Sequence, residues 1–471
     1  MLNNLKDFWH TYRWDIRLWL VFFFLIRLVG ITNPPLEMSH NWRQSLTAMI
    51  ALNFYDLGPN LLYPRIDIGG IREGIIGSEF PLFNYLIYLV SEVFGYKHWY
   101  GRLINLTVST VGVFYFYKGL IRLVKKDVAF YATIILAVSV WFGFSRKIMP
   151  DTFSVSLGII GLYFGLVYLQ EKGLGSLLWF FLWSTLGILC KIPTLSLFAV
   201  LAVSVFSNQF SWKHKLSLYA TFIGSMFLVW IWYFYWVPYL VETYYYQLFF
   251  PKNLIAGWQE IRTVLPELFE KFYFVALSSF FGFLCFILGI VYLGRSVEKE
   301  RLLILGLSSV TLIFGVFVLK TGSVFPSHSY YIIPFVPVMA IVAGYFLGNI
   351  KTKYAIGLSV LISIEAIANQ QDDLFLKESE MYKLRLTEIA NEYIPTDSLV
   401  VLNATASPQQ IYFANRNGWS EDSETLLQEG YIDSLNEIGA GYLIWDKKYS
   451  PFPNKGTVLF KDENYTVSKL D

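Results

Sequence analysis

Apolar runs of near-membrane length recur from residue 16 to residue 369, and they constrain the fold more than any other feature. A helix needs about 20 such residues to cross the hydrocarbon of a bilayer. The composition agrees, since 15% of the residues are charged, whereas a soluble chain would carry about 25%. We therefore expect a polytopic α-helical membrane protein with about 11 transmembrane helices. The runs cover residues 16–33, 102–124, 128–145, 153–170, 174–190, 193–207, 216–241, 272–294, 302–319, 329–349 and 353–369.

Lysine and arginine are concentrated on one face of the predicted bundle. They precede the first run and recur in alternate loops, at residues 122–126, 213–215, 295–301 and 351–353. The positive-inside rule makes this face cytoplasmic. An odd number of spans then places the N-terminus in the cytoplasm and the C-terminal tail outside, as in a bacterial inner-membrane protein with a periplasmic tail. No small-residue cleavage site follows the first run, so we read it as a span and not as a signal peptide.

The membrane part is predicted to cover residues 1–370, with a large first outer loop at residues 34–101. Two segments of this loop, 41–57 and 79–96, are predicted to be helices that lie in the membrane interface. A span at 79–96 would place every later basic loop on the wrong face.

Residues 371–471 are predicted to form a small soluble α/β domain outside the membrane. They carry about 17 acids against 9 bases, which differs from the basic remainder of the chain. Their β-branched, aromatic and periodic segments indicate the following elements. Strands are expected at 398–404 and 441–445, helices at 379–394 and 423–437, and a hairpin at the end of the chain.

Cys190 and Cys285 both lie in apolar runs and are expected to fill the core, not to form a disulfide or a metal site. The formal net charge is +2, which names no partner, and no nucleic-acid partner is expected.

Several ionisable residues fall at the ends of apolar runs on the face that is poor in lysine and arginine. Charged groups are costly near hydrocarbon, so their presence there suggests a functional site. A set of acids, bases and cations at one membrane surface fits chemistry on a lipid-linked substrate. The set consists of Glu37, His40, Arg43, Glu79, Asp151, Lys191 and His328.

Glu37, His40 and Arg43 are spaced by three, so on a helix they would share a face. A carboxylate near an arginine stays ionised and is suited to act as a base. The alternative is a capped interfacial helix in which Ser39 precedes the first turn and Arg43 reaches the headgroups.

The other candidates have structural explanations too. Glu79 opens a helix, and Asp151 follows Pro150 in a first turn, where an acid suits the helix dipole. Arg146 and Lys147 form a basic pair on the face that should lack one, which favours anion binding.

Lys191, at the end of an apolar run, can reach headgroups or neutralise a phosphate, and Lys320 ends another run in a similar way. His328 begins a run together with Tyr330 and Tyr331. Tyrosines at this position usually anchor a helix in the interface, whereas a histidine can bind a metal or a phosphate. The chain contains no HExxH, CxxC, GxSxG or Walker pattern, which argues against protease, lipase and ATPase classes.

The order of these motifs resembles the GT-C superfamily of membrane glycosyltransferases. A first span is followed by an outer loop with an acidic, arginine-containing helix start, then by E-x-P, R-x-x-M-P-D and H-x-Y-Y-x-x-P. The branch is similar to the protein O-mannosyltransferases and the aminoarabinose (lipid A) transferases, glycosyltransferase families 39 and 83. The resemblance covers about residues 15–370.

The resemblance implies inverting transfer from a polyprenyl-phosphate sugar to a lipid, glycan or protein acceptor at the outer face of the membrane. A carboxylate activates the acceptor, and basic side chains, in some members with a divalent metal, stabilise the departing phosphate. The implied catalytic residues are Glu37, His40, Glu79 and Asp151. The implied donor-binding residues are Arg43, Arg146, Lys147, Lys191, Lys320, His328, Tyr330 and Tyr331, and the metal option falls on Glu79 and His328.

One position departs from the family pattern, because His40 stands where members usually carry an aspartate three residues before the arginine. Either Glu37 or His40 then takes over as the base, or the base is Glu79 or Asp151. A carboxylate is favoured, with Glu37 and Asp151 equally placed. Other classes remain open. A lipid-substrate transporter would place its charges at the bilayer midplane, and a glycan polymerase or ligase would have outer loops rich in arginine and histidine. A non-enzymatic scaffold that displays the tail domain would leave Glu37, Glu79, Asp151 and His328 without a function.

Overall fold

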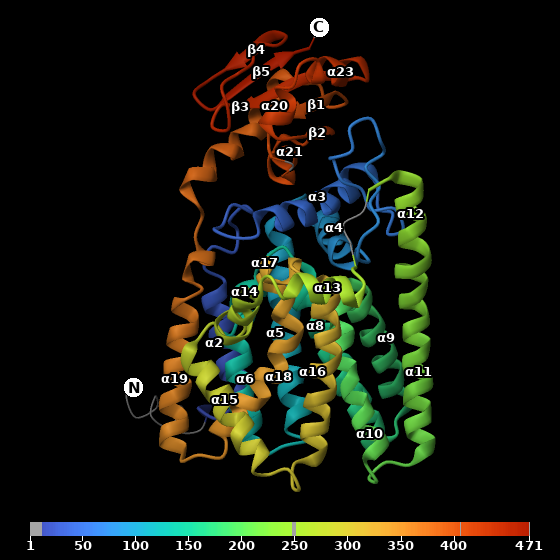
Figure 1. Cartoon of the computed structure of the whole chain (residues 1–471), viewed down its shortest axis with the longest axis vertical. Coiled ribbons are helices and arrows are strands. Elements are labelled where there is room, and N and C mark those ends of the chain that lie inside the picture. Colours follow the sequence, from blue (N-terminus) through green and yellow to red (C-terminus); the bar gives the residue numbers. More distant parts are fainter. Residues whose placement is uncertain (1–11, 247–250, 406, 471) are drawn as a thin grey trace. The chain divides into compact units, whose positions relative to one another are not determined.

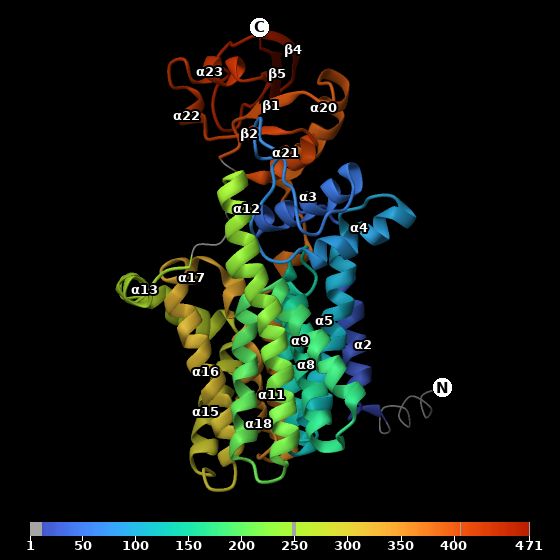
Figure 2. The ribbon, with the colours of Figure 1, turned by 90° about the vertical axis from the view of Figure 1, so that its right-hand side faces the viewer.

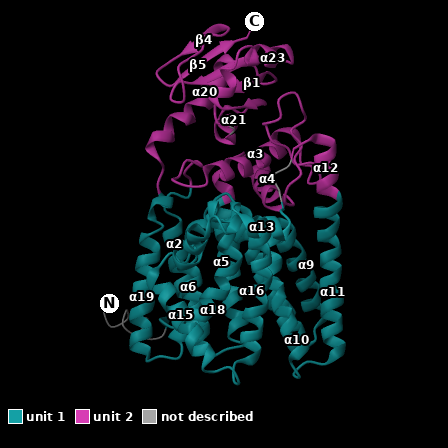
Figure 3. Cartoon of the chain, viewed as in Figure 1, with its two compact units in different colours: residues 1–31, 102–235, 250–374 teal, residues 32–101, 236–249, 375–471 magenta. Residues whose placement is uncertain are grey.

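The computed structural model describes residues 12–246, 251–405 and 407–470. The chain forms two compact units, which Figure 3 shows in different colours. Unit 1 comprises residues 1–31, 102–235 and 250–374, and unit 2 comprises residues 32–101, 236–249 and 375–471. This division rests on contacts and leaves the predicted domains, 1–370 and 371–471, as predictions.

Unit 1 is a helical bundle whose long helices run roughly parallel to one another (Figures 1 and 2). Neighbours pack in pairs, most extensively α8 with α9, α6 with α18, and α15 with α18. Its elements are α2 (Ile16–Arg27), α5 (Trp99–Leu120), α6 (Lys126–Val138), α7 (Trp141–Phe144), α8 (Pro150–Glu171), α9 (Leu174–Cys190), η1 (Ile192–Ala202), α10 (Val203–Phe206), α11 (Trp212–Trp230), η2 (Ile231–Trp236), α13 (Leu254–Ile261), α14 (Leu265–Glu270), η3 (Lys271–Val275), α15 (Phe280–Gly294), α16 (Arg301–Thr321), α17 (Val324–Ser327), η4 (Ser329–Phe335), α18 (Val336–Leu347), α19 (Thr352–Ala368) and η5 (Gln371–Leu374).

Every predicted apolar run contains a helix, which supports an integral membrane protein, but the number of 11 spans is not confirmed. Within the described residues, four helices are long and apolar enough to cross a membrane, and a fifth span results if a pair bent by 94° counts as one. The other runs are short or broken; α2, for instance, has 12 residues. The four helices are Pro150–Glu171, Trp212–Tyr244, Arg301–Thr321 and Ser329–Leu347.

The outer surface of the bundle is apolar, as expected for helices that face lipid. Large hydrophobic side chains are exposed along its peripheral helices, where a soluble protein would carry charges. Examples are Phe227 on α11, Leu284 on α15, Leu312 on α16 and Ile364 on α19. Cys190 and Cys285 are buried and free, which confirms their predicted place in the core.

Unit 2 contains the predicted helices of the first outer loop. The segment 41–57 forms α3 (Asn41–Leu57), and the segment 79–96 contains α4 (Leu82–Phe94). Both helices agree with the sequence, while their place in a membrane interface stays a prediction. The unit also includes α12 (Val237–Tyr244).

The C-terminal part of unit 2 carries a five-stranded sheet with the order β2-β1-β3-β5-β4. β1 pairs in parallel with β2 and β3, and β5 pairs antiparallel with β3 and β4. Val401, Leu443 and Trp445 are fully buried in the core of this sheet. The elements are η6 (Glu378–Arg385), α20 (Leu386–Tyr393), β1 (Leu399–Leu402), α21 (Pro408–Ala414), β2 (Gly418–Ser420), α22 (Ser423–Leu426), α23 (Tyr431–Glu437), β3 (Ala440–Asp446), β4 (Thr457–Lys461) and β5 (Tyr465–Lys469).

The tail agrees with the prediction in its strands and its final hairpin. It differs in α21, which was not predicted, in the 3₁₀ segment η6 that begins the predicted helix at 379–394, and at two further places. The predicted helix at 423–437 is divided into α22 and α23 because Gly430, with φ +74°, adopts a left-handed conformation between them. The sequence also gave no signal for β2, which is three residues long and begins at a glycine.

The packing of α15 on α18 leads to a first prediction. A Cβ atom at Gly289 would lie 2.0 Å from the backbone oxygen of Val342, so the helices approach through this glycine. We expect Gly289→Ala to destabilise the purified protein by about 1–3 kcal/mol and to lower its melting temperature. Gly315→Ala on α16 is the control, because no atom lies within 4 Å of a Cβ there. Equal melting temperatures for the two variants would contradict this packing.

Candidate functional site

A small cavity in unit 1 lies where α8 begins, α9 ends and η4 passes. Its volume is about 10 Å³, which is about the space that one water molecule requires. It is lined by Asp151, Val155, Lys191, Pro193, Tyr330, Tyr331 and Pro334. Four residues predicted from the sequence, Asp151, Lys191, Tyr330 and Tyr331, therefore meet at one place.

Prolines fix the helix ends that carry the two charged residues. Pro150 occupies the first turn of α8 after an extended Met149, which places Asp151 in that turn. On the other side, Lys191 is the C-cap of α9 in an extended conformation with ψ 110°, and η1 begins directly after it with Pro193 in its first turn. Pro193 has no backbone N–H and cannot continue the hydrogen-bond pattern of α9, so the helix ends before it and Lys191 leaves the helix in an extended conformation.

Asp151 and Lys191 form an ion pair in the cavity. The carboxylate is 4% exposed, and its Oδ1 lies 3.5 Å from the Lys191 Nζ. The same ammonium lies 5.4 Å from the centre of the Tyr330 ring. Among the described residues, no group donates a hydrogen bond to the buried Oδ2 of Asp151. A buried carboxylate oxygen without a donor is costly, so this atom is suited to receive a proton or a hydroxyl group from a ligand.

His328, Tyr330 and Tyr331 form an aromatic group beside the ion pair. The His328 ring lies 5.2 Å from the Tyr330 ring and 5.0 Å from the Tyr331 ring. Its Nδ1 lies 3.0 Å from the carbonyl oxygen of Val324, which orients the imidazole. The predicted H-x-Y-Y motif is therefore one cluster at the cavity.

Arg146 and Lys147 are buried and engaged with backbone and acidic groups of unit 1. The Arg146 guanidinium donates to the carbonyl oxygens of Val29, at 2.5 Å, and Asp373, at 3.1 Å. The Lys147 ammonium pairs with the Asp373 carboxylate at 2.8 Å. These contacts tie the segment before α8 to the end of the bundle, which is a structural role.

Two polar residues that the sequence analysis missed support this segment. Arg27 is fully buried and donates to the Ser145 hydroxyl at 2.7 Å, and its guanidinium lies 5.5 Å from the Phe142 ring. Gln370 accepts from the backbone of Gly143 and donates to the carbonyl oxygen of Val138. Arg27 is a charged residue near the end of the first apolar run, and the intramembrane-charge argument applied there would have found it.

Lys320 lies apart from the cavity-lining group. It is near the end of α16, and its Nζ donates to the carbonyl oxygen of Lys252 at 3.2 Å. Lys252 in turn pairs with Glu260. Lys320 is thus part of a local network at one end of α16.

The remaining predicted residues, Glu37, His40, Arg43 and Glu79, belong to unit 2. Glu37 is 1% exposed, and its Oε2 accepts from the Gln44 amide at 2.8 Å. His40 precedes α3 with φ +63°, a left-handed conformation that is uncommon for a residue with a side chain. The predicted sharing of a helical face by Glu37, His40 and Arg43 does not hold, because α3 begins only at Asn41.

Arg43 and Glu79 form an ion pair that joins the first turn of α3 to the segment before α4. The two side chains are 10% and 19% exposed. Glu79 was predicted as a cap or a catalytic acid. It does not cap α4, whose N-cap is Pro81, and its contact with Arg43 joins the two helical segments of the first outer loop.

A metal ion remains a prediction. Glu79 and His328, the two proposed ligands, are in different units. Among the residues that the structure describes, no group of three or more histidine, cysteine, aspartate or glutamate side chains is placed to hold a metal ion.

Comparisons with known proteins show which families and solved structures this chain resembles. Residues 78–234 match the family model of the dolichyl-phosphate-mannose-protein mannosyltransferases. A search of curated proteins finds no match.

Solved structures with the same fold include ArnT from Cupriavidus metallidurans in the apo state, with a TM-score of 0.66, 13% identity and coverage of 96% of this chain and 98% of ArnT. The same enzyme bound to undecaprenyl phosphate gives a TM-score of 0.64 at 12% identity, with the same coverage. The oligosaccharyltransferase AglB from Archaeoglobus fulgidus, in complex with an inhibitory peptide and a dolichol-phosphate, gives 0.55 at 12% identity over 92% of this chain and 70% of AglB.

The resemblance to the GT-C superfamily is confirmed. The match to ArnT covers 96% of this chain, so the shared fold includes residues of both units. At these identities the likeness to the solved structures concerns the fold.

The Arg43–Glu79 pair leads to a second prediction. We expect Arg43→Gln and Glu79→Gln each to destabilise the protein by about 3 kcal/mol, because each leaves a poorly solvated charge without its partner. The double variant should lose clearly less than the sum of the two single losses. Melting temperatures of the four purified proteins measure this coupling. Additive losses would show that the pair contributes nothing to stability.

Unit 2 also contains a buried carboxylate that the sequence analysis did not single out. Asp67 is 5% exposed, and its Oδ1 accepts from the Asn53 amide at 2.8 Å. Burial raises the pKa of Asp67 to about 7, although the hydrogen bond from Asn53 opposes the shift. The folded chain therefore holds this proton more tightly than the unfolded chain does.

This shift leads to a third prediction, for stability against pH. The contribution of Asp67 is fully present below about pH 4, is lost as pH rises toward 7 and is constant above that. Asp67→Asn should remove this part of the pH dependence and raise the melting temperature at pH 8. The exposed Asp397→Asn is the control. Identical pH profiles of the wild-type protein and Asp67→Asn would refute the assignment.

Proposed function

We propose that this chain is a membrane glycosyltransferase that moves a sugar from a polyprenyl-phosphate carrier to an acceptor, with inversion at the anomeric carbon. The description of the family model names a dolichyl-phosphate sugar donor. The ArnT and AglB structures contain undecaprenyl phosphate and dolichol-phosphate, respectively. A donor with a lipid phosphate suits the apolar bundle of this chain, which can hold the lipid, and the charged residues at its helix ends.

The hydrogen bonding of the buried Asp151 carboxylate is the observation that supports this proposal most strongly. Its Oδ1 contacts Lys191, while its buried Oδ2 has no hydrogen-bond donor among the described residues. We assign Oδ2 as the acceptor of the proton that the attacking hydroxyl loses. We prefer Asp151 to Glu37 as the base because the Oε2 of Glu37 already accepts a hydrogen bond from Gln44. Glu37, Glu79 and His40 stay weaker candidates for the base.

The same cavity provides a cation for the leaving group. As the acceptor oxygen attacks the anomeric carbon, the bond from that carbon to the phosphate oxygen breaks and its electron pair leaves with the phosphate. The Lys191 ammonium balances the charge that develops there, and His328 is a second donor close to the tyrosine pair. In an inverting displacement the base and the leaving-group cation stand on opposite sides of the reacting carbon, so donor binding must break the contact between Asp151 and Lys191.

Tyr330 and Tyr331 define the space for the sugar. The cavity in this structure admits one water molecule and no sugar. Donor binding therefore requires the tyrosine segment, η4, to move away from α8 and α9. Arg146, Lys147 and Lys320 have backbone or acidic partners, and we assign them supporting roles around the site. We assign Arg43, in unit 2, to donor binding, and its ion pair with Glu79 sets its orientation.

The site is proposed to face the outside of a bacterial inner membrane. The support is the charge pattern, since lysine and arginine are concentrated in the loops at the opposite ends of the helices. The acceptor is then a lipid, a glycan or a protein outside the cytoplasm.

The fourth prediction tests this function directly. The purified full-length protein is given labelled undecaprenyl-phosphate sugars, and release of undecaprenyl phosphate is measured. Asp151→Asn keeps the size of the side chain but cannot accept the proton, so we expect turnover to fall at least about 100-fold. Lys191→Gln should also lower turnover, because a cation at the leaving group is lost.

Glu171→Gln is the matched control, since this acid lies at the other end of the same helix and is exposed in an ion pair with Arg122. Full activity of folded Asp151→Asn would overturn the assignment of the base. Failure of the wild-type protein to turn over any such donor would favour a transporter or a glycan polymerase. A parallel assay with EDTA determines whether a divalent metal is required.

A further inference from the structure

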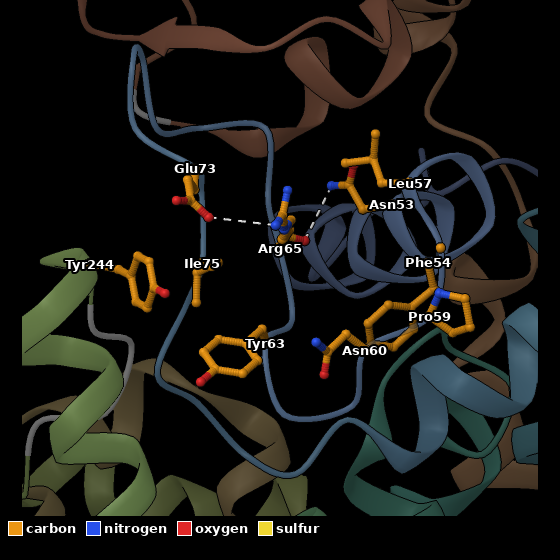
Figure 4. Close-up of a pocket in the computed structure, with 11 residues that line it drawn as sticks. Asn53, Phe54, Leu57, Pro59, Asn60, Tyr63, Arg65, Glu73, Ile75 and Tyr244 are labelled. Carbon is orange, nitrogen blue, oxygen red and sulfur yellow. Dashed lines mark hydrogen bonds and ion pairs between the residues drawn. The ribbon is translucent and has the colours of Figure 1, made fainter.

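Unit 2 contains a second, much larger cavity that no step of the proposed reaction uses (Figure 4). Its volume is about 490 Å³, within the range of about 300–1,000 Å³ that small-molecule sites occupy. It lies between the C-terminal half of α3, the loop at residues 58–75 and Tyr244 of α12. The cavity opens to the surface along residues 57–60, so a small molecule can enter it from outside.

The loop that forms one wall has a defined backbone structure. Arg65 and Ile75 pair in an antiparallel bridge, and the Ile66 amide donates to the Gly74 carbonyl oxygen at 2.9 Å. Gly74 has φ +68°, and a Cβ there would lie 2.0 Å from the Ile66 carbonyl oxygen. Only glycine can occupy this position, because a side chain would collide with the backbone, so the turn has a defined conformation.

Aromatic rings line the cavity and hold one another in place. The Tyr63 ring lies 6.2 Å from the Tyr244 ring at an interplanar angle of 85°, and 5.4 Å from the Trp236 ring. Trp236 is fixed in turn, because its Nε1 donates to the Leu62 carbonyl oxygen at 2.8 Å. Phe54 adds a third lining ring. Rigid rings of this kind bind the apolar faces of ligands at a low cost in entropy.

Polar groups between the rings supply both donors and acceptors. The Asn53 amide is fixed by its hydrogen bonds to Asp67 and to the Arg65 carbonyl oxygen. The Oδ1 of Asn60 accepts from the Leu62 amide at 3.1 Å, which orients its NH₂ group as a donor. Arg65 and Glu73 form an exposed ion pair at 3.5 Å, so the lining has both charges and no excess of either.

This lining selects one class of ligand. A lipid chain would remove water from the Asn60 amide and from the exposed Arg65–Glu73 ion pair without replacing its hydrogen bonds, and a phosphate would meet one arginine already offset by a glutamate. A carbohydrate matches both parts, since each sugar ring has apolar C–H faces for aromatic rings and hydroxyl groups for amides and charged groups.

We propose that this cavity binds the acceptor of the transfer reaction and that the acceptor is a carbohydrate chain. The role of the ligand as an acceptor rests on the proposed function, whereas the proposal that the cavity binds a carbohydrate rests only on its lining.

Saturation-transfer NMR on the purified full-length protein tests the proposal. The probes are maltotriose, cellotriose and triacetylchitotriose at millimolar concentrations. We expect binding of at least one probe. Tyr63→Ala should weaken that binding at least tenfold, while Tyr63→Phe, which keeps the ring, should retain it.

Two further variants keep the test independent of folding. Asn60→Trp introduces a large ring at an exposed position of the cavity rim and should also abolish binding. Tyr55→Ala removes an exposed tyrosine of α3 that does not line the cavity and should change nothing.

Absence of binding for all three probes would overturn the inference, and so would equal binding by wild-type protein, Tyr63→Ala and Asn60→Trp. Release of undecaprenyl phosphate from the donor, measured on the same preparations, separates the two proposals. Donor turnover without glycan binding refutes only the carbohydrate site, and glycan binding without donor turnover refutes only the transferase.

Discussion

The buried ion pair between Asp151 and Lys191 is the interaction on which the proposed chemistry depends. Removing two charges from water is costly, and their attraction repays this cost only when their remaining hydrogen-bond positions are satisfied. Here the second carboxylate oxygen has no donor among the described residues, so the site retains an acceptor that a substrate hydroxyl can use. The fold maintains this arrangement through the prolines that start α8 and η1, since these set where the two charged residues leave their helices.

The polar residues around this site divide into two kinds. Arg27, Arg146 and Lys147 are almost fully buried. They donate hydrogen bonds to carbonyl oxygens, a serine hydroxyl and Asp373, and these contacts hold the segment before α8 in place. Lys191 is more accessible, pairs with Asp151 and lies against the Tyr330 ring at the cavity. Burial and partners, and not charge alone, therefore distinguish a structural cation from one suited to bind a substrate.

The sequence predicted the parts of this protein that depend on local patterns. Apolar runs located the helices, β-branched segments located β1 and β3, and the segment predicted as a helix at 41–57 is α3 with the same bounds. The motif around His328 and the acid Asp151 were found as single positions, but their meeting in one cavity depends on helix packing that no local pattern encodes. The large cavity of unit 2 was missed for the same reason, since Tyr244 is distant in sequence from the loop that it joins. Gly430 shows that a single backbone conformation can divide a helix that the periodicity predicts as continuous.

The central claim is a single displacement in which one carboxylate deprotonates the acceptor while a cation holds the departing phosphate. The most direct measurement is the anomeric configuration of the product, determined by NMR after transfer from a donor of known configuration. A single displacement predicts the opposite configuration in the product. Retention would require a covalent glycosyl-enzyme intermediate and would contradict the role that the structure suggests for Asp151.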